Sequence, residues 1–277
     1  RKHFFFGYKL MISSVLDAAM REAYSFAIGK YFSIKTLGYF NQSKNFRNYP
    51  VNLLSAVVSS VSFPLLSRIQ EDREKVGRLY AQILRCVFFV VTPLMVSLIV
   101  VAKPLFLLLF TEKWLPAVPY FQLLAIVGIL TPVHAFNVNI FKIFNRTDLF
   151  LKLEIIKIAL VALVLLSGYL WGIYGLLYAN IVSSILGLLV NTFYSKRLIN
   201  YGTKEQLSDM IPVSIFALIA YFFGSFLLLK LALMSALAQV VLGVVCTFVF
   251  YLFTAVVLKS KSFYDVYALS KIIMKKI

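Results

Sequence analysis

Apolar side chains occur in long runs that recur from one end of the chain to the other, separated by short polar stretches. A helix that crosses a bilayer needs about 20 predominantly apolar residues, and these runs are of that length. The pattern predicts eight membrane helices, at 4–32, 37–66, 78–101, 118–144, 149–170, 174–194, 211–229 and 232–258. A short amphipathic tail follows them and is expected to lie on the membrane surface.

Composition supports this interpretation and reduces the number of candidate functions. Of the 277 residues, 61% are hydrophobic and 14% are charged, whereas a soluble domain is typically about 25% charged. The sequence therefore predicts an all-α, polytopic membrane protein. No glycine-rich phosphate loop, HExxH motif or Ser/His/Asp arrangement stands out, so we do not expect an enzyme. The two histidines, His3 and His134, are too few for a metal cluster, and no cofactor is predicted.

The net charge of +17 raises the question of nucleic-acid binding. No basic cluster with interleaved aromatic residues supports it, so we expect no nucleic-acid partner. Lysine and arginine gather instead in the loops that would be cytoplasmic if the N-terminus is inside, which is the usual bias of membrane proteins. The opposite loops hold only Lys30, Lys35, Lys103, Lys113 and Lys230. Both termini are therefore predicted to be cytoplasmic.

The first predicted helix carries charge where charge is costly. Lys9, Asp17 and Arg21 are spaced at multiples of four residues and share one helix face. A charge near the middle of a bilayer costs at least about 2.5 kcal/mol, so this face is expected to turn toward protein or a water-filled cavity. Asp17 and Arg21 either form a structural ion pair or line such a cavity. Glu22 lies about 100° around the helix and points toward a different neighbour.

The second predicted helix begins with a polar stretch, NQSKNFRNYP, that includes Lys44 and Arg47. This stretch is too polar to face lipid. It either projects above the bilayer or lines a hydrated cavity near the outer face. The basic residues inside the predicted helices favour an anionic ligand over a cationic one.

Polar side chains in the later helices are fewer. The motif TPVHAFNVN contains His134 and Asn137, and the histidine is either a proton relay or a hydrogen-bonded packing residue. Glu154 and Lys157 are three residues apart and are expected to pair along their own helix. Interhelical hydrogen bonds are expected from Asn180, Ser183, Ser184 and Asn191.

Several separated stretches resemble one protein family. These are IGKYFSIKTLGYFNQSKNFRNYPVN, VSSVSFPLLSRIQEDREK, EKWLPAVPYFQLL, HAFNVNIFKIFNRTDLFLKLEIIK and NTFYSKRLINYG. They are similar to Wzx-type oligosaccharide flippases of bacterial surface-polysaccharide synthesis, which are relatives of the multidrug MATE transporters. The resemblance covers nearly the whole chain but corresponds to the second half of such a protein.

The resemblance implies an architecture and a mechanism. Family members have two six-helix bundles, often followed by two extra helices, so residues 1–200 would be the second bundle and 201–277 the extra helices and tail. The first bundle would be a missing N-terminal half. The substrate would be a polyprenyl-diphosphate-linked oligosaccharide, moved across the bacterial inner membrane by alternating access. Its sugar and diphosphate would enter a cavity while its lipid tail stays among the membrane lipids.

The resemblance also suggests roles for residues. Arg21 and Lys9 would offer positive charge to the diphosphate, Asp17 would balance them or carry a coupling proton, and Lys44 and Arg47 would extend the basic path outward. The candidate cavity-lining set is Lys9, Asp17, Arg21, Glu22, Lys44, Arg47, His134 and Asn137. Alternatives are a MATE-like drug or cation exporter and a membrane-embedded polysaccharide polymerase or ligase. Other polysaccharide-assembly proteins are further candidate partners.

Overall fold

The computed structural model describes the backbone of residues 2–274. It describes the side chains of 11–12, 15–16, 18–20, 22–60, 62–146, 148–268 and 271. Throughout this part of the chain the regular secondary structure is helical. The helices are α1 (Lys2–Tyr31), α2 (Ile34–Arg68), α3 (Arg73–Val100), α4 (Ala102–Phe110), the 3-10 helix η1 (Glu112–Ala117), α5 (Val118–Ile143), α6 (Thr147–Ile199), α7 (Thr203–Lys230), α8 (Ala236–Val257) and α9 (Lys261–Met274).

The long element α6 consists of two helices joined by a sharp turn. Trp171 and Gly172 leave the helical conformation, and Gly172 has φ 72°, which a residue with a side chain rarely adopts. The two halves then run back alongside each other, since the Ser167 hydroxyl donates to the carbonyl of Gly175 over 3.2 Å. A Cβ on Gly175 would lie 2.7 Å from the Cβ of Trp171, so this close return requires glycine. With α6 divided in this way, each of the eight predicted segments corresponds to a long helix.

Helix length and hydropathy identify a multi-pass membrane protein. Within the described residues, five helical stretches are long and apolar enough to cross a bilayer. They are Ile34–Arg68, Arg73–Val100, Glu112–Ile143, Thr203–Lys230 and Ala236–Val257. The prediction of an all-α, polytopic membrane protein is therefore confirmed.

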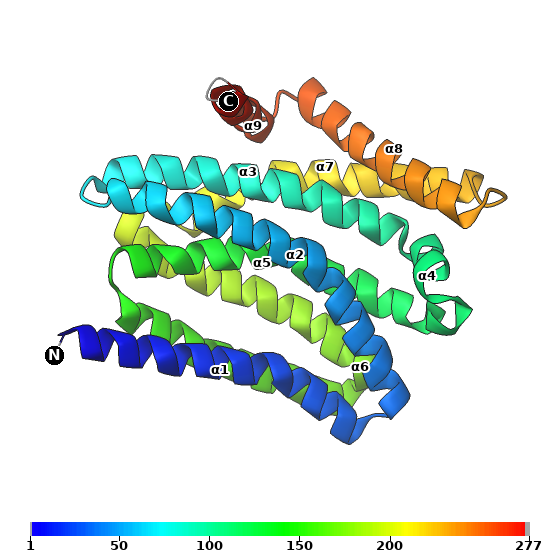
Figure 1. Ribbon diagram of the computed structural model, residues 1–277, viewed down its shortest axis with the longest axis horizontal. Helices are drawn as coiled ribbons and strands as arrows, with labels where there is room; N and C mark the ends of the chain where they lie inside the picture. Colours follow the sequence, from blue (N-terminus) through cyan, green and yellow to red (C-terminus); the bar gives the residue numbers. More distant parts are fainter. Residues whose placement is uncertain (1, 275–277) are drawn as a thin grey trace.

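Figure 1 shows the long helices running side by side, with α5 in the middle of the assembly. The helix α5 packs against α2, α3 and α6, and α1 packs against α6. The C-terminal helices join this group through α3, which contacts α7, α8 and α9. The division into 1–200 and 201–277 stays a prediction.

The connections alternate between the two ends of the assembly. The loops after α2, α5 and α6 gather at one end, whereas the α1–α2 loop, the turn within α6 and the α7–α8 loop gather at the other, and α8 ends partway back toward the first end (Figure 1). The first end is the one whose loops are rich in lysine and arginine. The loops that the sequence marks as rich or poor in lysine and arginine therefore lie at opposite ends of the molecule.

Candidate functional site: a polar cleft among α1, α2, α5 and α6

A cavity of about 230 Å³ lies among α1, α5 and the two halves of α6, inside the helix assembly. Its polar lining comes from helices that are distant in sequence. These side chains are Tyr24, Thr131, His134, Glu154, Lys157, Asn180, Ser183 and Ser184. We call this cavity, together with the adjoining polar part of α2 around Lys44 and Arg47, the polar cleft.

His134 is held by hydrogen bonds on both sides of its ring. The Asn191 amide nitrogen, which can only donate, lies 3.1 Å from Nδ1, so Nδ1 accepts and the proton sits on Nε2. Nε2 then donates to the Ser184 hydroxyl over 3.1 Å. The predicted interhelical bonds of Ser184 and Asn191 are confirmed. This arrangement fixes the ring between α5 and α6, and the alternative of a proton relay stays open.

Glu154 and Lys157 form the local pair that their spacing predicts. Lys157 Nζ lies 2.7 Å from Glu154 Oε1, and Glu154 is buried at the lining of the cleft. A lysine this close compensates the buried carboxylate, which would be costly alone. The pair brings both signs of charge into the cleft.

The helix α2 presents two basic residues to the cleft, and their surroundings differ. Lys44 Nζ lies 3.5 Å from Glu22 Oε1 and 3.4 Å from the Ser25 hydroxyl, so it bridges α2 to α1. The Ser25 hydroxyl also donates to Asn41 over 3.0 Å. The expectation that Glu22 serves a neighbouring helix is confirmed.

Arg47 is the cation that lacks such compensation. Its Nη1 donates to the Thr131 hydroxyl over 3.2 Å, and Thr131 lines the cleft. Its Nε is buried without a hydrogen-bond partner, and within the described residues no carboxylate forms an ion pair with the guanidinium. Gly128 makes room for the side chain, since a Cβ there would lie 3.0 Å from Arg47 Cδ. Arg47 is thus a half-buried, weakly bonded guanidinium beside a polar cavity.

The remaining predicted site residues fall into two groups. The side chains of Lys9, Asp17 and Arg21 lie outside the described residues, although their backbone belongs to α1. Asn137 is fully buried elsewhere: it accepts from Tyr80 Oη over 2.6 Å and exchanges amide hydrogen bonds of 3.1 Å with Gln206. These partners come from α3 and α7, so Asn137 does not share the cleft with His134.

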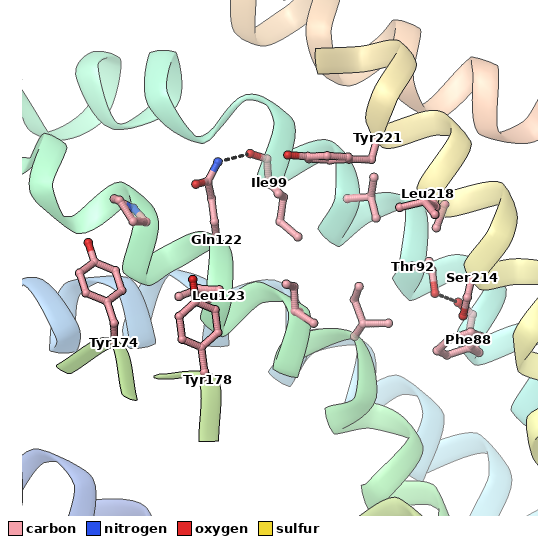
Figure 2. Close-up of a pocket in the computed structure, with 15 residues that line it drawn as sticks. Phe88, Thr92, Ile99, Gln122, Leu123, Tyr174, Tyr178, Ser214, Leu218 and Tyr221 are labelled. Carbon is pink, nitrogen blue, oxygen red and sulfur yellow. Dashed lines mark hydrogen bonds between the residues drawn. The ribbon is translucent and has the colours of Figure 1, made fainter. Parts of the chain in front are cut away.

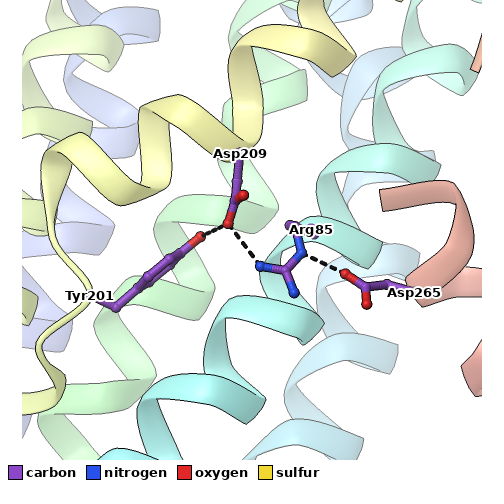
Figure 3. A network of polar contacts seen from close by, with 4 residues as sticks. All are labelled: Arg85, Tyr201, Asp209 and Asp265. Atoms are coloured by element: carbon purple, nitrogen blue, oxygen red, sulfur yellow. Dashed lines mark hydrogen bonds and ion pairs between the residues drawn. The ribbon is translucent and has the colours of Figure 1, made fainter. Parts of the chain in front are cut away.

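A second charged cluster was not anticipated from the sequence. Arg85 of α3 donates from Nη1 to Asp209 over 2.9 Å and from Nε to Asp265 over 2.5 Å, while Tyr201 Oη donates to Asp209 over 2.7 Å (Figure 3). Burial raises the pKa of Tyr201, so its hydroxyl stays protonated and keeps donating. We call these four residues the Arg85 junction. Its one sequence signal is that Arg85 is the sole charged residue between Arg78 and Lys103.

An apolar groove of about 560 Å³ lies on another side of α5, among α3, α6 and α7 (Figure 2). Tyr174 and Tyr178 of α6 and Tyr221 of α7 line it together with aliphatic side chains. Gln122 lies at its wall and donates to the carbonyl of Ile99 over 3.1 Å. The groove therefore offers hydrocarbon surface with few free polar groups.

Fold and cleft together define a polytopic helical membrane protein with a charged interior. Comparison with known sequences is consistent with this class: residues 1–119 match a family described as polysaccharide biosynthesis protein. No solved structure matches the chain.

Three curated relatives resemble a longer part of the chain. The lipopolysaccharide biosynthesis protein WzxC of Escherichia coli K12 is 24% identical over 68% of this chain and 38% of its own length. The teichuronic acid biosynthesis protein TuaB of Bacillus subtilis is 28% identical over 65% of this chain and 37% of its own length. An uncharacterized membrane protein in the cps region of Klebsiella pneumoniae is 25% identical over 70% of this chain and 40% of its own.

The matched part of the chain thus spans about two fifths of the length of these relatives. The chain is similar to polysaccharide biosynthesis proteins, so the resemblance inferred from its sequence is confirmed, over 65–70% of the chain and not over nearly all of it.

Proposed function

We propose that this chain is part of a transporter in surface-polysaccharide biosynthesis. The transporter would flip a polyprenyl-diphosphate-linked oligosaccharide from the cytoplasmic to the outer leaflet of the bacterial inner membrane by alternating access. Two observations support the proposal: the similarity to WzxC and TuaB, and a charged cleft inside a membrane protein. Both termini are cytoplasmic in this proposal, because the lysine- and arginine-rich loops gather at one end.

The proposal depends most on one observation, the weakly compensated guanidinium of Arg47 beside the cleft. A guanidinium inside a membrane protein is costly unless an anion or several acceptors compensate it. Arg47 has one hydrogen bond, to Thr131, and a buried Nε without a partner. Its planar fork of donors suits phosphate oxygens, which it binds through paired, charge-assisted hydrogen bonds. A diphosphate in the cleft would supply the acceptors that the described protein groups do not.

The lipid part of the substrate has different requirements. A polyprenyl chain is hydrocarbon and gains nothing from a charged cleft, so it stays on the lipid side of the helices. The apolar groove among α3, α6 and α7 offers a surface of that kind. Polar headgroup and apolar tail would thus contact different sides of α5.

A complete transporter needs a second wall to the cleft. Because the chain matches about two fifths of the length of its relatives, we propose that a further six-helix half faces α1 and α2. Lys9, Asp17 and Arg21 of α1 would then line the shared cavity, as their common helix face predicts. Transport by residues 1–277 alone is not expected.

The test uses the full-length protein in a cell that lacks its own lipid-linked-oligosaccharide transporter. Arg47→Ala should abolish surface-polysaccharide export at normal protein abundance, and Arg47→Lys should retain part of it because charge remains while the fork is lost. Arg78→Ala removes an exposed arginine and serves as the matched control. Normal export by the Arg47→Ala variant would refute the proposed role of the cleft.

A further inference from the structure

The C-terminal helix α9 is placed differently from the membrane helices. It begins at Lys261, shortly after α8 ends at Val257. In Figure 1 it is seen nearly end-on, whereas α3, α7 and α8 lie across the picture, so α9 crosses the direction of the bundle. If the bundle axis follows the membrane normal, α9 lies in the plane of the membrane.

The level of α9 along the bundle follows from what it touches. Asp265 reaches Arg85, and Phe263 packs edge-on against Phe89. Arg85 is about 18 Å along α3 from its start at Arg73, at 1.5 Å per residue. The helix α9 therefore lies beside the bundle, level with the end of α8, and not beyond the tip of α3. Because α8 is long and apolar enough to span a bilayer, its end at Val257 would lie at the membrane boundary, which places α9 at the level of the lipid headgroups.

The two faces of α9 differ sharply. Ser262, Phe263, Asp265 and Val266 turn inward, and Phe263 and Val266 pack against the core. Asp265 is the only acidic residue in the helix, and the Arg85 junction draws it into this inner face. The outward face is thereby left without negative charge in the described part of α9.

The outward face carries lysine and tyrosine. Lys261, Tyr264, Tyr267 and Lys271 are exposed and recur every three or four residues, within an arc of about 120°. Tyrosine has an apolar ring and a polar tip, and lysine has an apolar stem and a charged head, so both suit the boundary between hydrocarbon and headgroups. The face is thus positively charged and amphipathic at headgroup level.

We propose that this outward face of α9 binds the headgroups of anionic phospholipids in the adjacent leaflet. The lysines contact the phosphates, the tyrosine rings lie at the interface, and the Asp265–Arg85 ion pair sets the rotation of the helix. Lipid binding here uses elements separate from the polar cleft, so it does not depend on the proposed transport function.

The experiment titrates purified full-length protein in mild detergent with phosphatidylglycerol or phosphatidylcholine and follows the midpoint of thermal unfolding. We expect phosphatidylglycerol to raise the midpoint more than phosphatidylcholine. The Lys261→Gln/Lys271→Gln variant should bind phosphatidylglycerol roughly 30-fold more weakly, the equivalent of about 2 kcal/mol. The control variant Lys75→Gln/Lys204→Gln removes the same charge from the same end of the bundle and should respond like the unmodified protein.

A second measurement tests the position of the face directly. The Tyr264→Trp change is made in full-length protein whose other tryptophans, Trp114 and Trp171 among them, are replaced by phenylalanine. The fluorescence of the remaining tryptophan should be quenched by brominated phospholipids in vesicles. Full retention of phosphatidylglycerol binding by the α9 lysine variant, or a tryptophan that the brominated lipids do not reach, would overturn the proposal. The second outcome would indicate that the face is turned toward water and a soluble partner.

Discussion

Two interior arginines of this protein have opposite environments. Arg85, on α3, is 8% exposed and donates hydrogen bonds to two carboxylates, one from α7 and one from α9. Arg47, on α2, donates to one hydroxyl, and its Nε has no hydrogen-bond partner. A buried arginine surrounded by carboxylates joins helices, whereas one left with spare donors is available for an anion. The difference separates a structural cation from a candidate binding cation, which residue type alone cannot do.

The neighbours of each arginine extend the contrast. Near the Arg85 junction, Tyr80, Asn137 and Gln206 bond to one another in a fully buried set that joins α3, α5 and α7. In the polar cleft, side chains border a cavity of about 230 Å³. The Arg85 junction also borders a hollow, of about 700 Å³, but its cation is compensated by two carboxylates, whereas Arg47 beside the polar cleft keeps spare donors.

The largest expected effect comes from breaking the Arg85 junction. Arg85→Ala leaves two carboxylates without their cation, which typically costs about 3–5 kcal/mol of unfolding free energy. The thermal unfolding midpoint and the yield of purified protein should fall together. Adding Asp209→Asn and Asp265→Asn should restore part of the loss. An unchanged midpoint in the single variant would show that the junction does not hold the helices.

Asn137→Ala should have the next largest effect. It leaves the Tyr80 hydroxyl and the Gln206 side chain with fewer partners in a buried site, at an expected cost of about 1–3 kcal/mol. The unfolding midpoint measures this loss. Because Asn137 faces away from the cleft, substrate affinity of the folded fraction should stay unchanged, and a selective loss of affinity would instead return Asn137 to the substrate site.

Replacing the surface arginine Arg78 should change the stability of the protein very little. Arg78 pairs with Glu74 over 3.2 Å, and both side chains are mostly exposed. Such i,i+4 pairs contribute about 0.5 kcal/mol or less. Arg78→Ala should therefore leave the unfolding midpoint nearly unchanged, and a large drop would mean that exposure is a poor guide to the role of arginines here.

Arg47→Ala should have the smallest effect on stability, despite its interior position. The change removes a charge that the described protein groups compensate weakly, so the unfolding free energy should stay the same or rise slightly. The same unfolding measurement as for Arg85→Ala provides the comparison. A loss as large as that of Arg85→Ala would show that Arg47 is a structural residue after all.

Much of the fold was predictable because hydropathy is a local signal. All eight helical segments follow from runs of apolar residues, and the Glu154–Lys157 pair follows from a spacing of three. The partners of Arg85 lie 124 and 180 residues away along the chain, and no local pattern connects them. Long-range helix packing decides such contacts, and it was not available from the sequence.

Asn137 shows a second limit. It lies three residues from His134, which places the two side chains within about 60° of each other around the helix. Because α5 is packed against α2, α3 and α6, that angle is enough to send His134 toward α6 and Asn137 toward α3 and α7. When a helix is surrounded by other helices, two residues whose spacing places them on one face of it can still belong to different sites.

The most direct test of the account is to measure how tightly a polyprenyl diphosphate binds to the full-length protein in lipid nanodiscs, with and without Arg47. Charge-assisted hydrogen bonds of this kind contribute about 1.5–3 kcal/mol, so Arg47→Ala should weaken binding roughly 10- to 100-fold and Arg47→Lys should weaken it less. Equal affinities for the unmodified protein and the Arg47→Ala variant would contradict the claim that Arg47 is the anion-binding residue of the polar cleft.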